Sequence, residues 1–302
     1  MTERSAEVEV SPGFAEAVRE AVVGREREQR LVISALAAGR DLLLEGPPGT
    51  SKTTLLRTIT AAFGVPLVFV EGNADLTTTR LVGHHDPAAV LQQGFSADTF
   101  IEGPLVRAMR TGGFLYVEEV NRAPEDTLNA LLTAIAEREL TVPRMGVVTA
   151  APGFRLVASM NPFDNIGTSR ISSSVYDRLC RVAIGYQSAD DEIEIVRRRT
   201  DAAPSVISDA VALTRLTRIH PLVRQGSSVR GAIDLALVAE QLIALDRPVD
   251  DGAYAATMRD AMHVALSGRI RLDEAAGVSS EAILDELWEQ HFLLGKRRAE
   301  PG

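Results

Sequence analysis

Cysteine is almost absent from this chain, since Cys180 is the single one among 302 residues. One cysteine excludes an internal disulfide framework and a zinc cluster built from several cysteines. It fits a chain kept in a reducing compartment. No run of about 18 apolar residues occurs, and the N-terminal segment MTERSAEVEV lacks the apolar stretch of a signal peptide. These absences predict a cytoplasmic protein without a membrane span.

Positive charge is also scarce. Lysine and arginine number 32 against 41 aspartates and glutamates, which gives a net charge of −9. Proteins that bind nucleic acid irrespective of its sequence present a basic surface, so this balance makes nucleic acid an unexpected main partner. The length allows two domains of roughly 150 residues each.

Short apolar runs alternate with amphipathic stretches over the first part of the chain. Buried strands separated by helices indicate an α/β fold, a parallel sheet with helices on both faces. We expect this domain to span residues 1–187. The expected strands are 41–45, 66–71, 114–118, 155–159 and 181–186, and the expected early helices are 13–23, 26–38 and 52–63.

Two segments interrupt this alternation. Residues 80–104 hold three glycines and two prolines, too many for one helix. Residues 139–153 contain two β-prone pieces around a short turn, which predicts a hairpin. Insertions of this kind usually serve function or interfaces.

The remainder, residues 188–302, is predicted to be a smaller all-helical domain. Apolar residues recur there every three or four positions and mark five helices. The breakers between them are Pro204, Pro221, Gly226, Pro248 and Gly277.

Three other polar features have structural interpretations. The pair His84-His85 has no companion at metal-ligand spacing and is expected in a loop. Cys180 adjoins a core strand and is expected to pack in the interior. The run 197–199 is all arginine and follows several acids on one helix, an order that suits the helix dipole.

The strongest motif is GPPGTSKT, residues 46–53, which lies between an expected strand and an expected helix. Glycines let backbone N–H groups converge on phosphates, and the helix start adds the positive end of a dipole. Lys52 would reach the β- and γ-phosphates of ATP, and the Thr53 hydroxyl would ligate Mg²⁺. The residues predicted to bind nucleotide are Gly46, Pro47, Pro48, Gly49, Thr50, Ser51, Lys52, Thr53 and Thr54, with Ser51 where the usual pattern has glycine.

Two adjacent acids, Glu118 and Glu119, end the segment FLYVEE, whose first four residues are apolar. In a phosphate-loop enzyme, the strand beside the loop brings an acid to the metal, and a second acid can polarise the attacking water. We therefore predict Glu118 as the metal-side carboxylate and Glu119 as the general base. Aspartate is usual at the first position, and Glu118 is one methylene longer.

The next expected strand, in RLVASMNP, is followed by Asn161. A neutral amide between the γ-phosphate and the water can orient the nucleophile without competing for its proton. Asn161 is predicted to take this catalytic role.

Two arginines are candidates for contacts with the γ-phosphate. Arg178 follows the helix after that strand, and could reach a neighbouring subunit's nucleotide if subunits form a ring. Its alternative is a surface pair with Asp177. Arg230 begins a helix of the second domain, where it could couple nucleotide state to domain angle, and its alternative is a solvated helix-start arginine.

Together these residues resemble the MoxR family of AAA+ ATPases, which is related to the magnesium-chelatase ATPase subunit. The most specific segments are GPPGTSKT, EEVNRAPEDTLNALL (118–132), ASMNP (158–162), YDRL (176–179) and SSVRGA (227–232). The two interrupting segments lie where relatives carry an insertion ahead of helix 2 and a hairpin before the third strand.

The resemblance implies a hexameric ring that hydrolyses ATP at subunit interfaces and remodels a client protein. Val22, Val23 and Gly24 would lie against the adenine. Relatives commonly act with a partner bearing a von Willebrand factor A domain, often in metalloenzyme maturation or the insertion of metals and cofactors, and a carbon monoxide dehydrogenase accessory role is one example.

Three other functions stay open at this stage. They are a phosphate-loop kinase of a small metabolite, a nucleic-acid-dependent AAA+ motor, and a nucleotide-binding scaffold without turnover. A kinase would need an acceptor, a motor would be stimulated by DNA, and a scaffold would show no basal hydrolysis.

Overall fold

The computed structural model describes residues 12–162, 173–273 and 277–294. They form two compact units, each with its own hydrophobic core. The first unit ends at Gly185 and the second begins at Tyr186, while the stretch Pro48–Thr50 groups with the second. The sequence analysis expected this boundary after residue 187.

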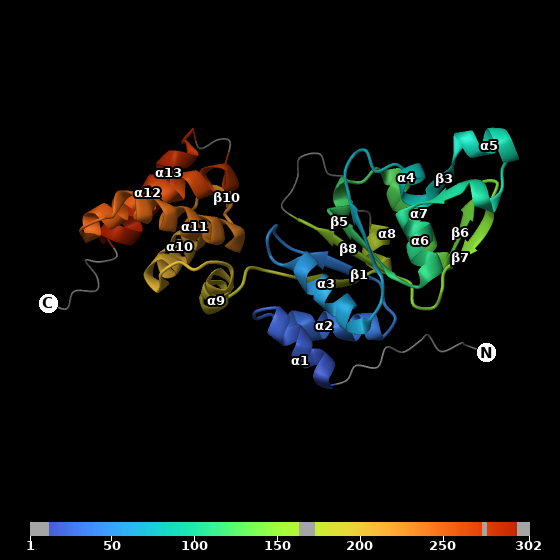
Figure 1. The fold of residues 1–302 in the computed structure, drawn as a ribbon, viewed down its shortest axis with the longest axis horizontal. Helices are drawn as coiled ribbons and strands as arrows, with labels where there is room; N and C mark the ends of the chain where they lie inside the picture. The colour runs from blue at the N-terminus through green and yellow to red at the C-terminus, as the bar shows by residue number, and fades with distance from the viewer. Residues whose placement is uncertain (1–11, 163–172, 274–276, 295–302) are drawn as a thin grey trace. The chain divides into compact units, whose positions relative to one another are not determined.

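A five-stranded parallel sheet forms the centre of the first unit (Figure 1), with the strand order β2-β5-β8-β1-β9. Each expected strand is present, but the last is shorter and starts one residue earlier than the apolar run 181–186. Beyond its end, Ile184 still donates to the carbonyl of Glu45 at 2.7 Å. The strands are β1 Leu42–Glu45, β2 Leu67–Glu71, β5 Phe114–Glu118, β8 Arg155–Met160 and β9 Cys180–Ala183.

Helices cover both faces of the sheet because successive side chains of a strand point to opposite faces. In β1, Leu42 and Leu44 join one hydrophobic cluster and Leu43 joins the other. The first cluster is completed by α1 Pro12–Ala21, α2 Glu26–Ala37 and α3 Lys52–Phe63. The second is completed by α4 Thr78–Val82, α6 Pro104–Thr111, α7 Glu125–Glu137 and α8 Ser173–Arg178.

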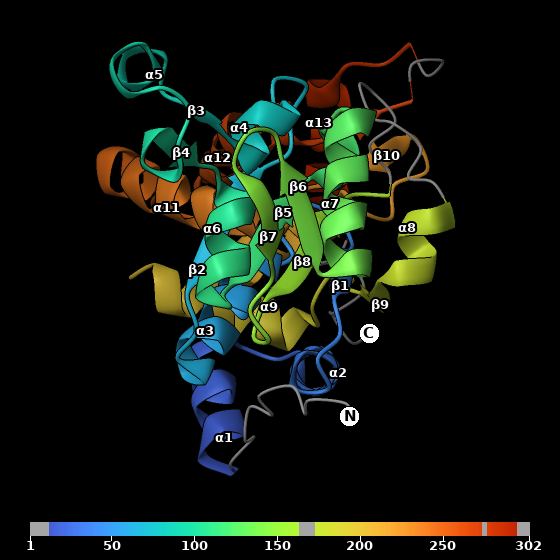
Figure 2. The same ribbon diagram turned by 90° about the vertical axis from the view of Figure 1, so that its right-hand side faces the viewer.

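The two interrupting segments form separate two-stranded sheets. The first pairs β3 Gly83–His85 with β4 Phe100–Glu102, and encloses α5 Pro87–Gln93 and the 3₁₀ turn Ala97–Thr99. The second is the predicted hairpin, β6 Glu139–Val142 with β7 Gly146–Thr149, which lies beside α6 and α7 (Figure 2). The Arg144 guanidinium lies 4.3 Å from the ring centroid of Phe95, so the two insertions touch.

The described residues of the second unit are helical, as expected, apart from one short antiparallel pair that the sequence did not reveal. That pair joins β10 Val223–Gln225 to β11 Arg271–Leu272, and Pro221 and Gly226 bracket β10. The five helices are α9 Ala189–Arg199, α10 Pro204–Leu216, α11 Val229–Asp246, α12 Asp251–Leu266 and α13 Ser280–Glu289. A 3₁₀ turn covers Ser267–Arg269, and a π-helical turn at Gln290–Leu294 follows α13.

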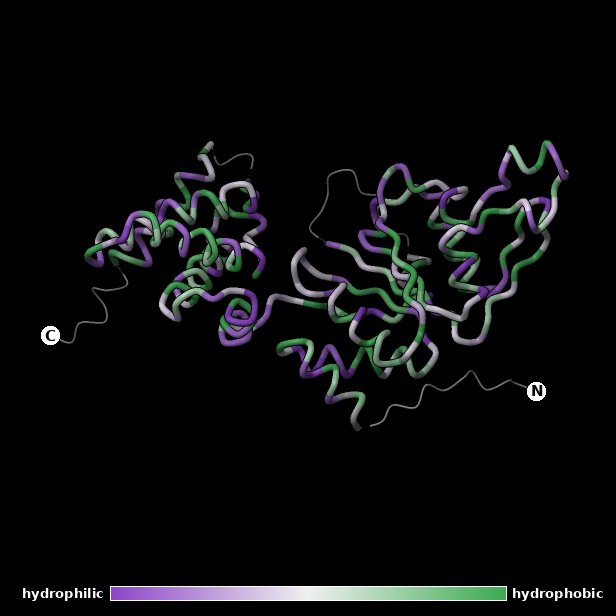
Figure 3. Tube along the Cα trace, viewed as in Figure 1, coloured by the Kyte–Doolittle hydropathy of each residue, from purple (hydrophilic) through white to green (hydrophobic). Residues whose placement is uncertain are grey.

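Helix α9 is the most hydrophilic helix of this unit, and Figure 3 shows it largely in purple. Three of its acids lie in the first turn and its arginines in the last, as expected from the dipole. One acid is an exception to the solvated pattern: Glu192 is 1% exposed and pairs with Arg218 at 2.7 Å and Arg215 at 3.2 Å.

Two expectations were wrong. Cys180 is exposed rather than packed, because it starts β9, an edge strand of the sheet. His84 and His85 lie in strand β3 rather than in a loop, and the Nδ1 atom of His85 is 3.1 Å from the hydroxyl oxygen of Thr99. Within the described ranges, no helix is both long and apolar enough to span a bilayer.

Candidate functional site

The turn that joins β1 to α3 has the strand–loop–helix setting predicted for residues 46–53. Gly46 is required there, because a Cβ atom would lie 1.9 Å from the carbonyl oxygen of Ile184. Ser51 adopts φ 63° and ψ 20°, the left-handed conformation in which glycine is unstrained. The serine therefore keeps the backbone shape that glycine would give, at a cost of about 1–2 kcal/mol.

Lys52 is the first residue of α3 and is only 8% exposed. Its Nζ donates to the carbonyl oxygens of Gly46 at 2.9 Å and Pro47 at 2.7 Å. The ammonium group thus curls over the loop at the positive end of the helix dipole. This combination of loop backbone, lysine and helix start suits an anion with several negative oxygens.

The two residues predicted to serve a metal meet beside this loop. The Thr53 hydroxyl donates to Oε1 of Glu118 at 2.7 Å, across 65 positions of sequence. With its hydrogen directed to the carboxylate, the threonine oxygen keeps its lone pairs for a cation. Hydroxyl and carboxylate oxygens are suitable ligands for Mg²⁺. A Mg²⁺ site usually contains one or two carboxylates and does not need a cluster of them. The described residues hold no cluster of three or more metal-binding side chains.

Tyr116 and Ser159 complete this cluster, and the sequence analysis missed both. The Tyr116 hydroxyl oxygen lies 3.3 Å from Thr53 Oγ1, 3.3 Å from Glu118 Oε1 and 3.0 Å from Ser159 Oγ. Burial raises the pKa of Tyr116 to about 12, so the phenol stays protonated at neutral pH. The spacing in the sequence could have revealed both residues. Tyr116 is two residues before Glu118, and Ser159 is two residues before Asn161. Residues two apart along a strand point to the same face of the sheet.

Glu119 follows the end of β5 in a left-handed conformation, with φ 52°. This turn directs the chain away from the sheet into the 3₁₀ turn Val120–Arg122. The carboxylate of Glu119 forms an ion pair with Arg122 at 2.9 Å and is partly exposed. The two adjacent acids therefore differ in their partners: Glu118 accepts from Thr53, and Glu119 pairs with the guanidinium of Arg122.

Gly72 is a further residue that the sequence analysis missed. It follows β2, its N–H donates to the carbonyl of Glu118 at 2.6 Å, and a Cβ atom there would lie 2.4 Å from the carbonyl oxygen of Glu119. The short contacts of such a Cβ would be with backbone atoms of Glu118 and Glu119, which cannot rotate away as a flexible side chain can. The backbone of the two acids would therefore have to move.

We expect Gly72→Ala to lower the free energy of unfolding by about 1–3 kcal/mol, the usual effect of overpacking, and to reduce ATP hydrolysis. Thermal unfolding and phosphate release measure the two effects. Gly252→Ala is the matched control, because Gly252 is exposed and the nearest atom to a Cβ there is a side-chain oxygen of Asp250 at 3.3 Å, not backbone. Equal effects from the two variants would show that the close approach at Gly72 is unimportant.

Asn161 follows β8 and is 9% exposed. Because β8 pairs in parallel with β5, Asn161 and the two acids leave the same edge of the sheet. The carbonyl of Met160 also accepts from the N–H of Gly46 at 3.1 Å, which ties this edge to the phosphate loop. The structure thus brings the predicted amide, acids and loop to one edge.

The segment predicted to contact the adenine is held by a residue that the sequence analysis did not select. Gln29 is 2% exposed, and its side-chain amide donates to the carbonyls of Val22 at 3.2 Å and Gly24 at 2.7 Å. Val23 is half-buried in this segment. Arg25, in a left-handed conformation, donates to the carbonyl of Gly185 at 2.8 Å. Thr54, the last predicted loop residue, is exposed.

Arg178 is the last residue of α8, and its side chain is exposed. Its Nη1 donates to the carbonyl of Ser174 at 3.0 Å, one turn back on the same helix. The arginine is therefore displayed at the surface of the first unit, and no described contact joins it to the loop, Thr53 or Glu118.

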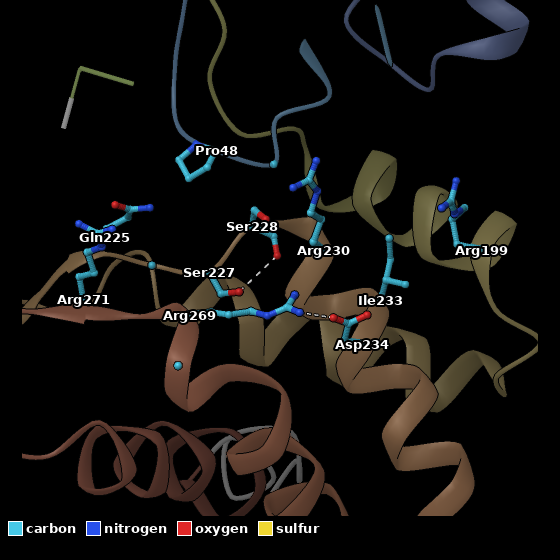
Figure 4. Close-up of a pocket in the computed structure, with 13 residues that line it drawn as sticks. Pro48, Arg199, Gln225, Ser227, Ser228, Arg230, Ile233, Asp234, Arg269 and Arg271 are labelled. Carbon is cyan, nitrogen blue, oxygen red and sulfur yellow. Dashed lines mark hydrogen bonds and ion pairs between the residues drawn. The ribbon is translucent and has the colours of Figure 1, made fainter. Parts of the chain in front are cut away.

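Arg230 is the second residue of α11 and lines a pocket of the second unit (Figure 4). Three more arginines, Arg199, Arg269 and Arg271, line the same pocket. Arg269 forms an ion pair with Asp234, the one acid in this lining. The excess of positive side chains makes the pocket suitable for an anion, and the three additional arginines were not predicted.

Comparisons with known proteins agree with this arrangement. Residues 41–179 match the AAA domain (dynein-related subfamily). The chain is 28% identical over 272 residues to the gas vesicle ATPase GvpN of Ancylobacter aquaticus, which covers 85% of this chain and 76% of that protein. It is 33% identical over 183 residues to YojN of Bacillus subtilis, 59% of each protein. A crystal structure from Cytophaga hutchinsonii, provisionally named an ATPase, shares the fold with a TM-score of 0.52 at 21% identity, over 91% of this chain and 92% of that one.

Proposed function

We propose that this chain, whose first unit has the AAA+ fold, is a MoxR-like ATPase of the cytoplasm. In this proposal, ATP hydrolysis in a hexameric ring drives the remodelling or maturation of a protein partner. The observation that supports the nucleotide chemistry best is the 2.7 Å hydrogen bond from Thr53 to Glu118 directly after the phosphate loop. It joins a hydroxyl and a carboxylate that Mg²⁺·ATP would require together.

The phosphate loop binds and orients ATP. Backbone N–H groups of Gly49, Thr50 and Ser51 and the Nζ of Lys52 contact the β- and γ-phosphates. Val23 and Gly24 lie against the adenine. Thr53 and Glu118 would hold Mg²⁺, and the ion would supply positive charge against the phosphate oxygens.

Hydrolysis requires a water aligned with the γ-phosphate. Glu119 accepts a proton from that water, and Asn161 orients it through its neutral amide. Attack forms a bond from the water oxygen to phosphorus and breaks the bond to the β-phosphate oxygen, so ADP and inorganic phosphate leave. Arg230 is proposed as a further contact of the γ-phosphate.

An exposed arginine at the end of α8 supports a ring. Arg178 has its guanidinium at the surface, and an arginine supplied by a neighbour stabilises charge on the transferring phosphoryl group. Each nucleotide-binding site would then be completed by the Arg178 of the next subunit.

Mixing two inactive variants tests this ring directly. We expect Arg178→Ala to bind ATP but to hydrolyse it about 10³-fold more slowly, the scale of an arginine supplied in trans. Adding Lys52→Ala subunits, which keep Arg178, should restore turnover at mixed interfaces. Phosphate release from the mixture is the measurement, and Arg197→Ala, on an exposed turn of α9, is the control. Absence of any rescue at high subunit concentration would count against a contribution from a neighbour.

The two insertions are the proposed site of the client. They expose large apolar side chains: Leu91 is 89% exposed, Val147 60%, Ile101 51% and Phe95 50%. By resemblance, the client is a metalloenzyme that receives a metal or cofactor, with a von Willebrand factor A domain protein as co-partner. The similarity to the gas vesicle ATPase GvpN makes a role connected with gas vesicles the second function to consider.

The alternatives have distinct outcomes in the same assay. Acceptor-independent phosphate release that increases with protein concentration excludes a small-metabolite kinase. Stimulation by DNA at physiological salt would favour a nucleic-acid motor, which the net charge of −9 opposes.

A further inference from the structure

Tyr116 lies at the middle of β5, and its side chain is 0% exposed. The ring faces α3 within the cluster that contains Leu55 and Leu56. The Phe69 ring, on the neighbouring strand β2, lies 5.7 Å from it between centroids. The ring is therefore fixed in place by packing, and its hydroxyl is a polar group at a defined position.

The hydrogen atoms around this hydroxyl can be assigned. A carboxylate only accepts hydrogen bonds, so Oε1 of Glu118 accepts from Thr53 at 2.7 Å and from Tyr116 at 3.3 Å. Ser159 Oγ, at 3.0 Å, can then donate to the phenol oxygen. This chain of donors from Ser159 through Tyr116 to Glu118 gives each hydrogen an acceptor.

The hydrogen bonds from Thr53 and Tyr116 restrain the carboxylate of Glu118. This restraint matters because the glutamate side chain is long. A glutamate has one more rotatable bond than the aspartate usual in this setting, so an unrestrained carboxylate would lose more freedom when it is fixed at a metal. Two donors on the same oxygen limit that freedom before any ligand binds. Phe114, Leu115 and Val117 of β5 are apolar, and Tyr116 is the one residue of this strand with a hydroxyl group.

We propose that the Tyr116 hydroxyl, supported by Ser159, is a positioning group that holds Glu118 and Thr53 in the arrangement that accepts Mg²⁺. This inference rests on the proposed metal-side roles of Thr53 and Glu118. Tyr116 acts through the carboxylate of Glu118, to which its hydroxyl donates.

Tyr116→Phe removes this hydroxyl and leaves the packed ring. We expect the Mg²⁺ concentration for half-maximal binding of a fluorescent ADP analogue to increase about tenfold, as for loss of one hydrogen bond to a charged group. Affinity for the same analogue without Mg²⁺ should stay within about twofold, since the loop itself is untouched. Electron paramagnetic resonance of Mn²⁺ with ADP provides the same measurement without turnover.

Tyr254→Phe is the matched control. Its hydroxyl also donates to a carboxylate, that of Asp209 at 2.8 Å, within the second unit. If the Tyr116 hydroxyl serves stability alone, both variants will lower the melting temperature and neither will change Mg²⁺ dependence. Ser159→Ala should shift the Mg²⁺ dependence in the same direction by a smaller factor, and it provides the test if Tyr116→Phe does not fold.

Two further variants distinguish a failure of this inference from a failure of the proposed metal site at Thr53 and Glu118. In the Glu118→Asp background, where the carboxylate is shorter, Tyr116→Phe should change the Mg²⁺ requirement by less than about twofold, because the interaction is already lost. Thr53→Val should weaken Mg²⁺-dependent binding strongly. A normal Mg²⁺ requirement in Thr53→Val would refute the metal site itself, whereas an altered Thr53→Val with an unaltered Tyr116→Phe would refute only the role of Tyr116.

Discussion

Glu119→Gln is expected to reduce ATP hydrolysis by about two orders of magnitude or more, the range in which a general base contributes, while ATP still binds. The substitution keeps the shape of the side chain but removes its ability to accept a proton. Glu119 lies beyond the strand end, where its carboxylate pairs with Arg122, so it is separate from the oxygen that bonds to Thr53. Loss of turnover without loss of binding would therefore separate its role from that of Glu118.

Single-turnover phosphate release and ATP affinity are the two measurements. Glu125→Gln is the matched control, because Glu125 is an exposed acid in the first turn of α7 only six positions away. Turnover of Glu119→Gln within about threefold of the unchanged chain would be too small an effect for a general base, and would assign this role to another group. A fall in ATP affinity equal to the fall in rate would instead indicate a damaged loop.

Lys52→Ala is expected to weaken ATP binding by about 10²-fold or more, because it removes charge-assisted hydrogen bonds to two phosphates. The side chain is 8% exposed and already bonds to the loop carbonyls of Gly46 and Pro47. The variant therefore also loses contacts that shape the loop. Both effects act in the same direction on ATP affinity.

Arg57→Ala on the same helix is the control for a lost positive charge, since Arg57 is exposed and lies over the Phe69 ring at 5.8 Å. Equilibrium binding of a fluorescent ATP analogue gives the affinities, and thermal unfolding shows whether each variant is folded. Equal affinities for Lys52→Ala and Arg57→Ala would mean that nucleotide does not bind at this loop.

The sequence predicts the elements whose signals are local. The apolar runs before Gly46 and Glu118 are long enough to specify buried strands, and the glycines and Lys52 specify the turn between strand and helix. The hairpin at 139–153 was predicted for the same reason, since β-prone residues flank a turn. In each case the deciding information lies within about ten residues of chain.

Contacts between strands distant in sequence were not predictable in this way. Tyr116 and Ser159 are 43 positions apart and meet because β5 pairs with β8. Gly72, which follows β2, is required by the backbone of Glu119, which follows the adjacent strand β5. Spacing shows which face a side chain shares, but the order of strands decides which side chains meet across it.

The other structural features that the sequence did not predict arise at an edge strand, in a short pair of strands and in a pocket of the second unit. Cys180 is exposed because β9 has a neighbour on one side only, which a hydrophobic run cannot show. The pair of β10 and β11 has too few residues for alternation to appear in sequence. The pocket arginines Arg199, Arg269 and Arg271 come together only when the helices of the second unit pack.

Steady-state phosphate release from ATP across a range of protein concentrations, without nucleic acid or acceptor, tests the central claim most directly. The account predicts that turnover per subunit increases with concentration as rings form, requires Mg²⁺, and is absent from Lys52→Ala. Phosphate release equal to that of Lys52→Ala at every concentration would contradict it.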